Sequence, residues 1–144
     1  MGTAIALNKS SLSFCLVLLV VLSISRTIDG CFTAKVKVQV RNAIPGNYVL
    51  SAHCKSGDDD LHERILHFNQ GFDWTFCVKP TTLFWCNVVR RDSAGKDQGS
   101  GGFQAFNNEA RPCGESYCFI DVAADAQGVL KTWSDGFTER VVTW

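Results

Sequence analysis

The chain has 144 residues, 46% of them hydrophobic, and its 14 lysines and arginines balance its 14 aspartates and glutamates. This length suits one domain with a buried core. Without net charge the chain exerts no long-range pull on a polyanion, so nucleic acid and anionic membrane surfaces are not expected partners.

The first 30 residues predict a secretory signal peptide. Lys9 precedes an apolar run of 11 residues, 12–22. That run is shorter than the roughly 20 apolar residues that span a bilayer, but it suits the core of a signal peptide. A short buried strand or helix is the alternative. Small residues suit cleavage after Ser25 or Gly30. We therefore expect a cleaved leader at residues 1–30, a single domain at residues 31–144, secretion, and no insertion into a membrane.

Cysteine usage predicts disulfide bonds. Cys15 lies inside the predicted leader, so six cysteines would remain in the secreted protein. An even number in an oxidising compartment indicates a disulfide framework. These six are Cys31, Cys54, Cys77, Cys86, Cys113 and Cys118. Their spacing contains no CxxC pair and does not suggest zinc, and the sequence alone leaves their pairing open.

The first half of the domain shows strand-like alternation. Residues 35–41 place three valines on one face and charged or polar residues on the other, which is typical of a strand with one buried face. Pro45-Gly46 predicts a turn, and residues 48–54 predict a second strand. Residues 61–68 are the one helical candidate, with poor apolar spacing. Residues 72–78 alternate again and predict a third strand.

The second half reads as a hairpin followed by three more strands. Residues 82–89 and 103–106 predict the two arms of the hairpin, and the polar, glycine-rich residues 90–102 predict a long loop at its tip. The further strands are at residues 117–124, 129–133 and 137–144. About eight short strands separated by turns indicate an all-β fold, and we expect a small disulfide-bonded antiparallel β-sandwich rather than a barrel.

The alternation also predicts which side chains form the core. We expect six apolar side chains, drawn from five of these strands, to be buried: Val38, Leu50, Trp74, Phe76, Phe84 and Val122.

Residues suited to catalysis or metal binding are few. His62 and His67 are five residues apart, whereas two zinc ligands on one helical face need a separation of four. A ribonuclease would need two histidines as acid and base and a cation at the phosphate, and His53 lies alone on its strand. Residues 58–60 are three consecutive aspartates, but calcium needs more ligands at an organising spacing. We therefore expect no enzyme, metal or cofactor.

Several segments in order resemble the plant self-incompatibility protein family, the secreted S-protein homologues. The most specific is His-Cys-Lys-Ser-Gly-Asp-Asp-Asp-Leu at residues 53–61. The resemblance covers residues 34–130 and is carried further by residues 36–42, 74–76, 81–86, 103–106 and 128–130 and by the Cys113/Cys118 pair. The chain departs from the family pattern at His62, where glycine is usual, at Ile120, where tryptophan is usual, at Gln127, where the family has aspartate before Gly128, and at the additional Cys31 and Cys77.

The resemblance implies a secreted β-sandwich ligand without catalytic activity that binds a receptor in the plasma membrane. If the family's four usual cysteines pair among themselves, the resemblance also implies a Cys31–Cys77 bridge. A secreted defence protein, either a ribonuclease or a carbohydrate-binding protein, is the alternative function.

Binding residues tend to lie on loops that a rigid scaffold holds. The predicted loop at residues 90–102 is the longest polar segment of the domain, so we expect it to contact the partner. The turn at residues 58–60 is the rival site, and a tolerated disordered insertion is the alternative interpretation of the long loop. The candidate partner-binding residues are its charged side chains Arg90, Arg91, Asp92, Lys96 and Asp97.

Overall fold

The structure is a computed structural model of the chain, and it describes residues 2, 13–14, 17, 30–114 and 117–144. Residues 31–144 form one compact unit, distinct from residues 1–30. Most of the predicted leader lies outside the described residues. Within the residues described, no helix is long and apolar enough to cross a membrane.

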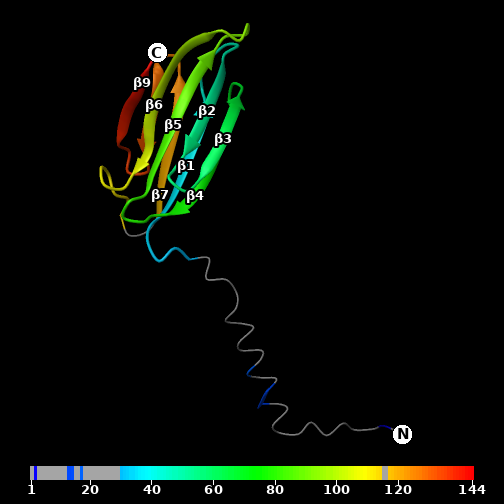
Figure 1. The fold of residues 1–144 in the computed structure, drawn as a ribbon, viewed down its shortest axis with the longest axis vertical. Helices are drawn as coiled ribbons and strands as arrows, with labels where there is room; N and C mark the ends of the chain where they lie inside the picture. Colours follow the sequence, from blue (N-terminus) through cyan, green and yellow to red (C-terminus); the bar gives the residue numbers. More distant parts are fainter. Residues whose placement is uncertain (1, 3–12, 15–16, 18–29, 115–116) are drawn as a thin grey trace. The chain divides into compact units, whose positions relative to one another are not determined.

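Nine strands make up the described part of the domain, arranged as two facing sheets (Figure 1). They are β1 (Lys35–Asn42), β2 (Val49–Lys55), β3 (Asp60–Leu66), β4 (Gly71–Cys77), β5 (Leu83–Arg91), β6 (Asp97–Asn107), β7 (Tyr117–Asp125), β8 (Gly128–Trp133) and β9 (Thr138–Thr143). One sheet has the order β4-β1-β7-β8-β9, and the other has the order β3-β2-β5-β6. The prediction of an all-β sandwich is confirmed. The pairing is antiparallel except between β1 and β7, which run parallel.

The core lies between the sheets and follows the predicted alternation. Val38, Leu50, Phe84 and Val122 are buried, as expected from the sequence. Trp74 and Phe76 are only partly buried and pack against the margin of the core. The expectation of full burial was wrong for these two because β4 is an edge strand, so solvent reaches its inward side chains from the open side.

One strand replaces the predicted helix. Residues 60–66 form β3, which pairs antiparallel with β2 along the edge of its sheet. Its alternation is hard to recognise in the sequence because Arg64 takes the place of an apolar residue on the inward side, opposite Ala52. The guanidinium of Arg64 lies over the ring of Phe72, 5.9 Å from its centroid.

The glycine-rich segment is also a strand rather than a loop. β5 and β6 continue through residues 90–91 and 97–102, which leaves a turn of only residues 92–96. A Cβ atom on Gly101 would lie 2.5 Å from Val142 Cγ1, and one on Gly99 would lie 2.9 Å from the Trp144 ring. The prediction of a long loop was therefore wrong. These glycines allow β6 to approach β9, the edge strand of the other sheet, at positions where a side chain would clash.

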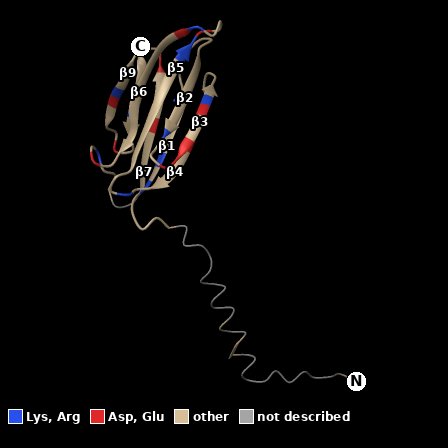
Figure 2. Cartoon of the chain, in the orientation of Figure 1, with Lys and Arg blue, Asp and Glu red and all other residues tan. Residues whose placement is uncertain are grey.

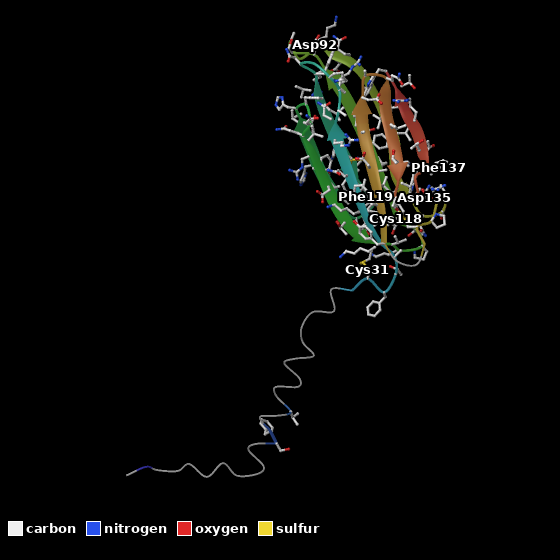
Figure 3. All side chains as sticks on the ribbon, turned by 180° about the vertical axis from the view of Figure 1, so that it is seen from behind. Cys31, Asp92, Cys118, Phe119, Asp135 and Phe137 are labelled. Atoms are coloured by element: carbon white, nitrogen blue, oxygen red, sulfur yellow. A yellow bond between two sulfur atoms is a disulfide. The ribbon has the colours of Figure 1, made fainter. Side chains whose placement is uncertain are left out.

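The strand directions separate the connections into two groups. The hairpin end carries residues 43–48, 67–70, 92–96 and 126–127 and the C-terminal Trp144. The disulfide end carries Cys31 and the described connections 56–59, 78–82, 108–114 and 134–137. Figure 3 shows Asp92 at the first end and Cys31 at the second.

All three disulfides lie at or near the disulfide end. They join Cys31 to Cys77, Cys54 to Cys86, and Cys113 to Cys118. The Cys31–Cys77 bridge is the one that the family resemblance implied, and the other four cysteines pair among themselves.

Candidate recognition surface

The turn between β5 and β6 is held by Asp92. The Asp92 carboxylate accepts hydrogen bonds from the amides of Ala94 and Lys96, both at 3.0 Å, and from Gln98 Nε2 at 2.7 Å. These donors, the Lys96 amide first, hold the pKa of Asp92 below its usual value. The carboxylate thus stabilises its own turn, in the way that aspartate commonly does.

Arg90 is likewise engaged within the chain. Its guanidinium lies between the rings of Tyr48 and Trp144, 5.1 and 5.3 Å from their centroids, and donates to the carbonyl oxygen of Gln98 at 2.9 Å. Trp144 in turn donates its indole N–H to the carbonyl oxygen of Asp125 at 2.7 Å. The arginine therefore joins the loop at residues 43–48 to the C-terminal residue.

The other three candidate residues are more accessible. Arg91, the last residue of β5, donates from Nε to Oδ1 of Asp97, the first residue of β6, at 2.9 Å. Lys96 is exposed in the turn between them. Acidic and basic residues accordingly lie side by side at the end of β5 and the turn that follows (Figure 2). The structure brings all five candidates together in one hairpin, where Arg90 and Asp92 make hydrogen bonds that hold the hairpin itself.

A shallow hollow of about 420 Å³ lies beside this turn. It is lined by residues from three connections, namely Gly46, Asn47, Tyr48, His67, Phe68 and Ser93, and by Val49 at the start of β2. The Phe68 side chain is 49% exposed. Sequence analysis missed this residue because it placed Phe68 at the end of a helix rather than in a turn.

Buried Asn42 fixes the loops around the hollow. Its side-chain amide donates to the carbonyl oxygens of Tyr48 at 3.1 Å and Leu66 at 2.9 Å, and its Oδ1 accepts from the Ile44 amide at 2.9 Å. One side chain therefore satisfies backbone groups of two neighbouring connections, which keeps them in a fixed relation.

The signature segment at residues 53–61 forms a turn at the opposite end. Ser56 Oγ accepts from the Asp59 amide at 3.0 Å, and Asp60 Oδ1 lies 2.6 Å from His53 Nε2 and accepts from the His62 amide at 2.8 Å. The hydrogen bond from His53, followed by that from the His62 amide, lowers the pKa of Asp60. These contacts account for the serine, the histidine and the third aspartate of the signature as parts of a turn.

The three histidines lie in two places. His53 and His62 share Asp60, and His67 lies at the hairpin end. Among the residues the structure describes, no group of three or more histidine, cysteine or acidic side chains is suited to hold a metal ion.

Comparison with known proteins identifies a single family. Residues 37–144 match the sequence profile described as Plant self-incompatibility protein S1. S-protein homolog 1 of Arabidopsis thaliana is 30% identical over 112 residues, which cover 74% of this chain and 68% of that protein. S-protein homolog 29 of Arabidopsis thaliana is 42% identical over 60 residues, which cover 39% of this chain and 43% of that protein.

A solved structure shares the fold. It is described as the structure of self-incompatibility protein homologue proteins, a widespread family of small, highly stable, secreted proteins from plants. It superposes with a TM-score of 0.56 at 16% sequence identity and covers 80% of this chain and 98% of its own.

Proposed function

The chain belongs to the plant self-incompatibility protein S1 family, and on that premise we propose that it is a secreted, non-enzymatic recognition protein that binds a receptor at the cell surface. The predicted leader and the three disulfides support export. The described secretion of the related plant proteins supports it as well.

The observation that carries the proposal is the hollow at the hairpin end. Three connections from a rigid sandwich converge there and present an exposed phenylalanine, Phe68, and the turn that contributes Ser93 to the hollow also carries the exposed Lys96. Loops that gather at one end of a β-sandwich are a common platform for recognition. Aromatic side chains are enriched in protein interfaces, and a few residues dominate the binding energy there.

The candidate residues divide into two roles. Phe68, Lys96 and the Arg91–Asp97 pair would contact the receptor, since they are accessible groups at the hairpin end. Arg90 and Asp92 would act indirectly by holding the hairpin and the adjacent loop in position.

Binding to plant plasma-membrane vesicles tests this assignment. We expect Phe68→Ala and Lys96→Ala each to weaken saturable binding of the labelled protein about tenfold or more, because both remove a side chain from the proposed contact. Lys79→Ala is the matched control, since Lys79 is an exposed lysine at the disulfide end. All three variants should keep the wild-type melting temperature. The proposal fails if Lys79→Ala weakens binding while the two hairpin-end variants bind normally.

A further inference from the structure

A lateral groove opens where β6 and β9, the edge strands of the two sheets, move apart. Near the hairpin end Gly101 lies against Val142 and the sheets are closed. Toward the disulfide end a groove of about 480 Å³ replaces this contact. Its main lining residues are Phe103 and Gln104 from β6, Lys131 and Trp133 from β8, Phe137, and Glu139 from β9.

A lysine forms part of the floor of this groove. β8 directs Val129, Lys131 and Trp133 into the sandwich, and Lys131 is paired in register with core residue Val122. Its side chain is only 7% exposed. Its Nζ donates to the carbonyl oxygen of Gln104 at 2.8 Å and lies 4.3 Å from the centre of the Trp133 ring. A charged group at an inward-facing position costs free energy unless it is compensated.

The compensation of this cation is incomplete. Glu139, directly opposite on β9, brings its carboxylate to 3.5 Å from Lys131 Nζ, but that side chain is itself 51% exposed. Burial lowers the pKa of Lys131, and the attraction of Glu139 acts in the opposite direction without restoring it. The amine is therefore a cation whose present carboxylate partner stands at the mouth of the groove, within reach of solvent.

Aromatic and donor groups surround the amine. Trp133 is 7% exposed, and within the described residues its indole N–H is buried without an acceptor. Phe137 packs edge-to-face on Trp133 at 5.3 Å. Arg111 closes the end of the groove, with its guanidinium 4.1 Å from the Phe137 ring centre and an ion pair to Asp135 at 2.5 Å. The groove thus offers the cation of Lys131 and apolar ring surface together, and it calls for a ligand that supplies a negative charge and an apolar body.

We propose that this groove binds a small ligand that carries a carboxylate on a ring, an acidic sugar or an aromatic acid, with the carboxylate on Lys131 Nζ in place of Glu139 and the ring against Trp133 and Phe137. The site lies apart from the hairpin end, so it is independent of the proposed receptor contact. In the free protein the Glu139 carboxylate lies next to the Lys131 amine, and the carboxylate of the ligand displaces it.

Titration of the full-length secreted protein with three probes tests the proposal. Trigalacturonic acid and benzoate represent the two sources of the chemistry, and neutral galactotriose lacks the carboxylate. The readouts are the dissociation constant and the NMR resonance of the Trp133 indole N–H, which shifts when a ligand packs against that ring. We expect a saturable shift with at least one of the two acids and none with galactotriose.

Three variants locate the effect. Lys131→Met should lose about tenfold or more in affinity while the fold is retained, because an apolar side chain of similar length suits an inward-facing position. Glu139→Gln should bind roughly two- to fivefold more tightly, since it removes the competing carboxylate. Lys37→Met, which removes a lysine paired with Asp73 on the first sheet, should leave the affinity unchanged.

Trigalacturonic acid alone as ligand would identify an acidic sugar site, and benzoate alone would identify an aromatic acid site. The proposal is overturned if neither acid binds at millimolar concentration, if galactotriose binds as well as the acids, or if Lys131→Met binds normally. Should Lys131→Met fail to fold, an unchanged or weakened affinity of Glu139→Gln would overturn the proposal in its place.

Discussion

The two ends of the sandwich are held together by different chemistry. At the disulfide end, three covalent bridges join Cys31 to β4, β2 to β5, and the connection before β7 to β7 itself. At the hairpin end, the described connections are held by the amide of Asn42, the carboxylate of Asp92 and the stacking of Arg90 between two rings.

This difference suggests how the molecule divides its tasks. Covalent bridges stabilise a small domain largely by restricting its unfolded chain, whatever the residues nearby. The noncovalent contacts at the hairpin end each depend on one or two side chains, so residues that are not part of them, such as Phe68 and Lys96, are open to change without loss of the fold. A scaffold that is fixed at one end and tolerant of substitution at the other suits the proposed recognition function.

Removal of bridges should show the largest effect, and the effect should follow loop length. The Cys54–Cys86 bridge spans 32 residues and the Cys113–Cys118 bridge spans 5. Loop-closure entropy predicts a loss of about 4 kcal/mol in the free energy of unfolding for Cys54→Ala/Cys86→Ala and about 2 kcal/mol for Cys113→Ala/Cys118→Ala. Denaturant unfolding of the two double variants measures this order. An equal or reversed order would show that the bridges do not act through the unfolded chain.

Asn42 should be the strongest noncovalent contact at the hairpin end. Asn42→Ala leaves the carbonyls of Tyr48 and Leu66 and the amide of Ile44 without their present partner in a buried place. We expect a loss of about 2–3 kcal/mol in the free energy of unfolding. Asn47→Ala, an exposed change in the same loop, should alter it by less than about 0.5 kcal/mol. Similar losses for the two variants would show that Asn42 is not the strongest noncovalent contact at the hairpin end.

Neighbouring arginines provide a third comparison within the hairpin. Arg90→Ala removes the contacts with two aromatic rings and the hydrogen bond to Gln98. We expect thermal unfolding to show a loss of about 1–2 kcal/mol. Arg91→Ala breaks accessible ion pairs with Asp97 at 2.9 Å and Glu63 at 4.0 Å and should cost less than about 0.5 kcal/mol. A larger effect of Arg91 would mean that the stack of Arg90 contributes nothing to stability.

Backbone strain gives the smallest expected effect and again distinguishes the ends. His62, where the family usually has glycine, has φ 59° near the disulfide end, and Asn69 has φ 63° at the hairpin end. Asparagine tolerates the left-handed region better than most side chains. We therefore expect His62→Gly to stabilise by about 0.5–1 kcal/mol, while Asn69→Gly leaves the melting temperature nearly unchanged. Destabilisation by His62→Gly would show that the contacts of His62 with Asp60 outweigh the strain.

The sandwich and most of its core could be predicted because alternation along a strand depends only on local sequence. Val36, Val38 and Val40 show this pattern plainly, and all three are buried. The pattern failed at β3, where Arg64 faces inward, and at β6, where Gly99 and Gly101 replace side chains that would clash with β9. In both places the residue contacts the opposite sheet, and the partner residues in that sheet are distant in the sequence.

The candidate surface was predictable only in part for the same reason. The charged residues around Asp92 stood out by composition, but their internal contacts with Tyr48, Gln98 and Trp144 depend on tertiary structure. Phe68 and Lys131 were missed because nothing in their neighbourhood distinguishes an exposed phenylalanine from a buried one, or an inward-facing lysine from a solvated one.

Hydrogen exchange in the presence of the receptor tests the central claim most directly. The receptor ectodomain, isolated by crosslinking and expressed in soluble form, is added to the full-length secreted protein, and amide protection is followed by peptide. The division into two ends predicts new protection at residues 43–48, 67–70 and 92–96, with no change at residues 56–59 and 78–82. Protection confined to those last two segments would contradict it and would place recognition at the disulfide end.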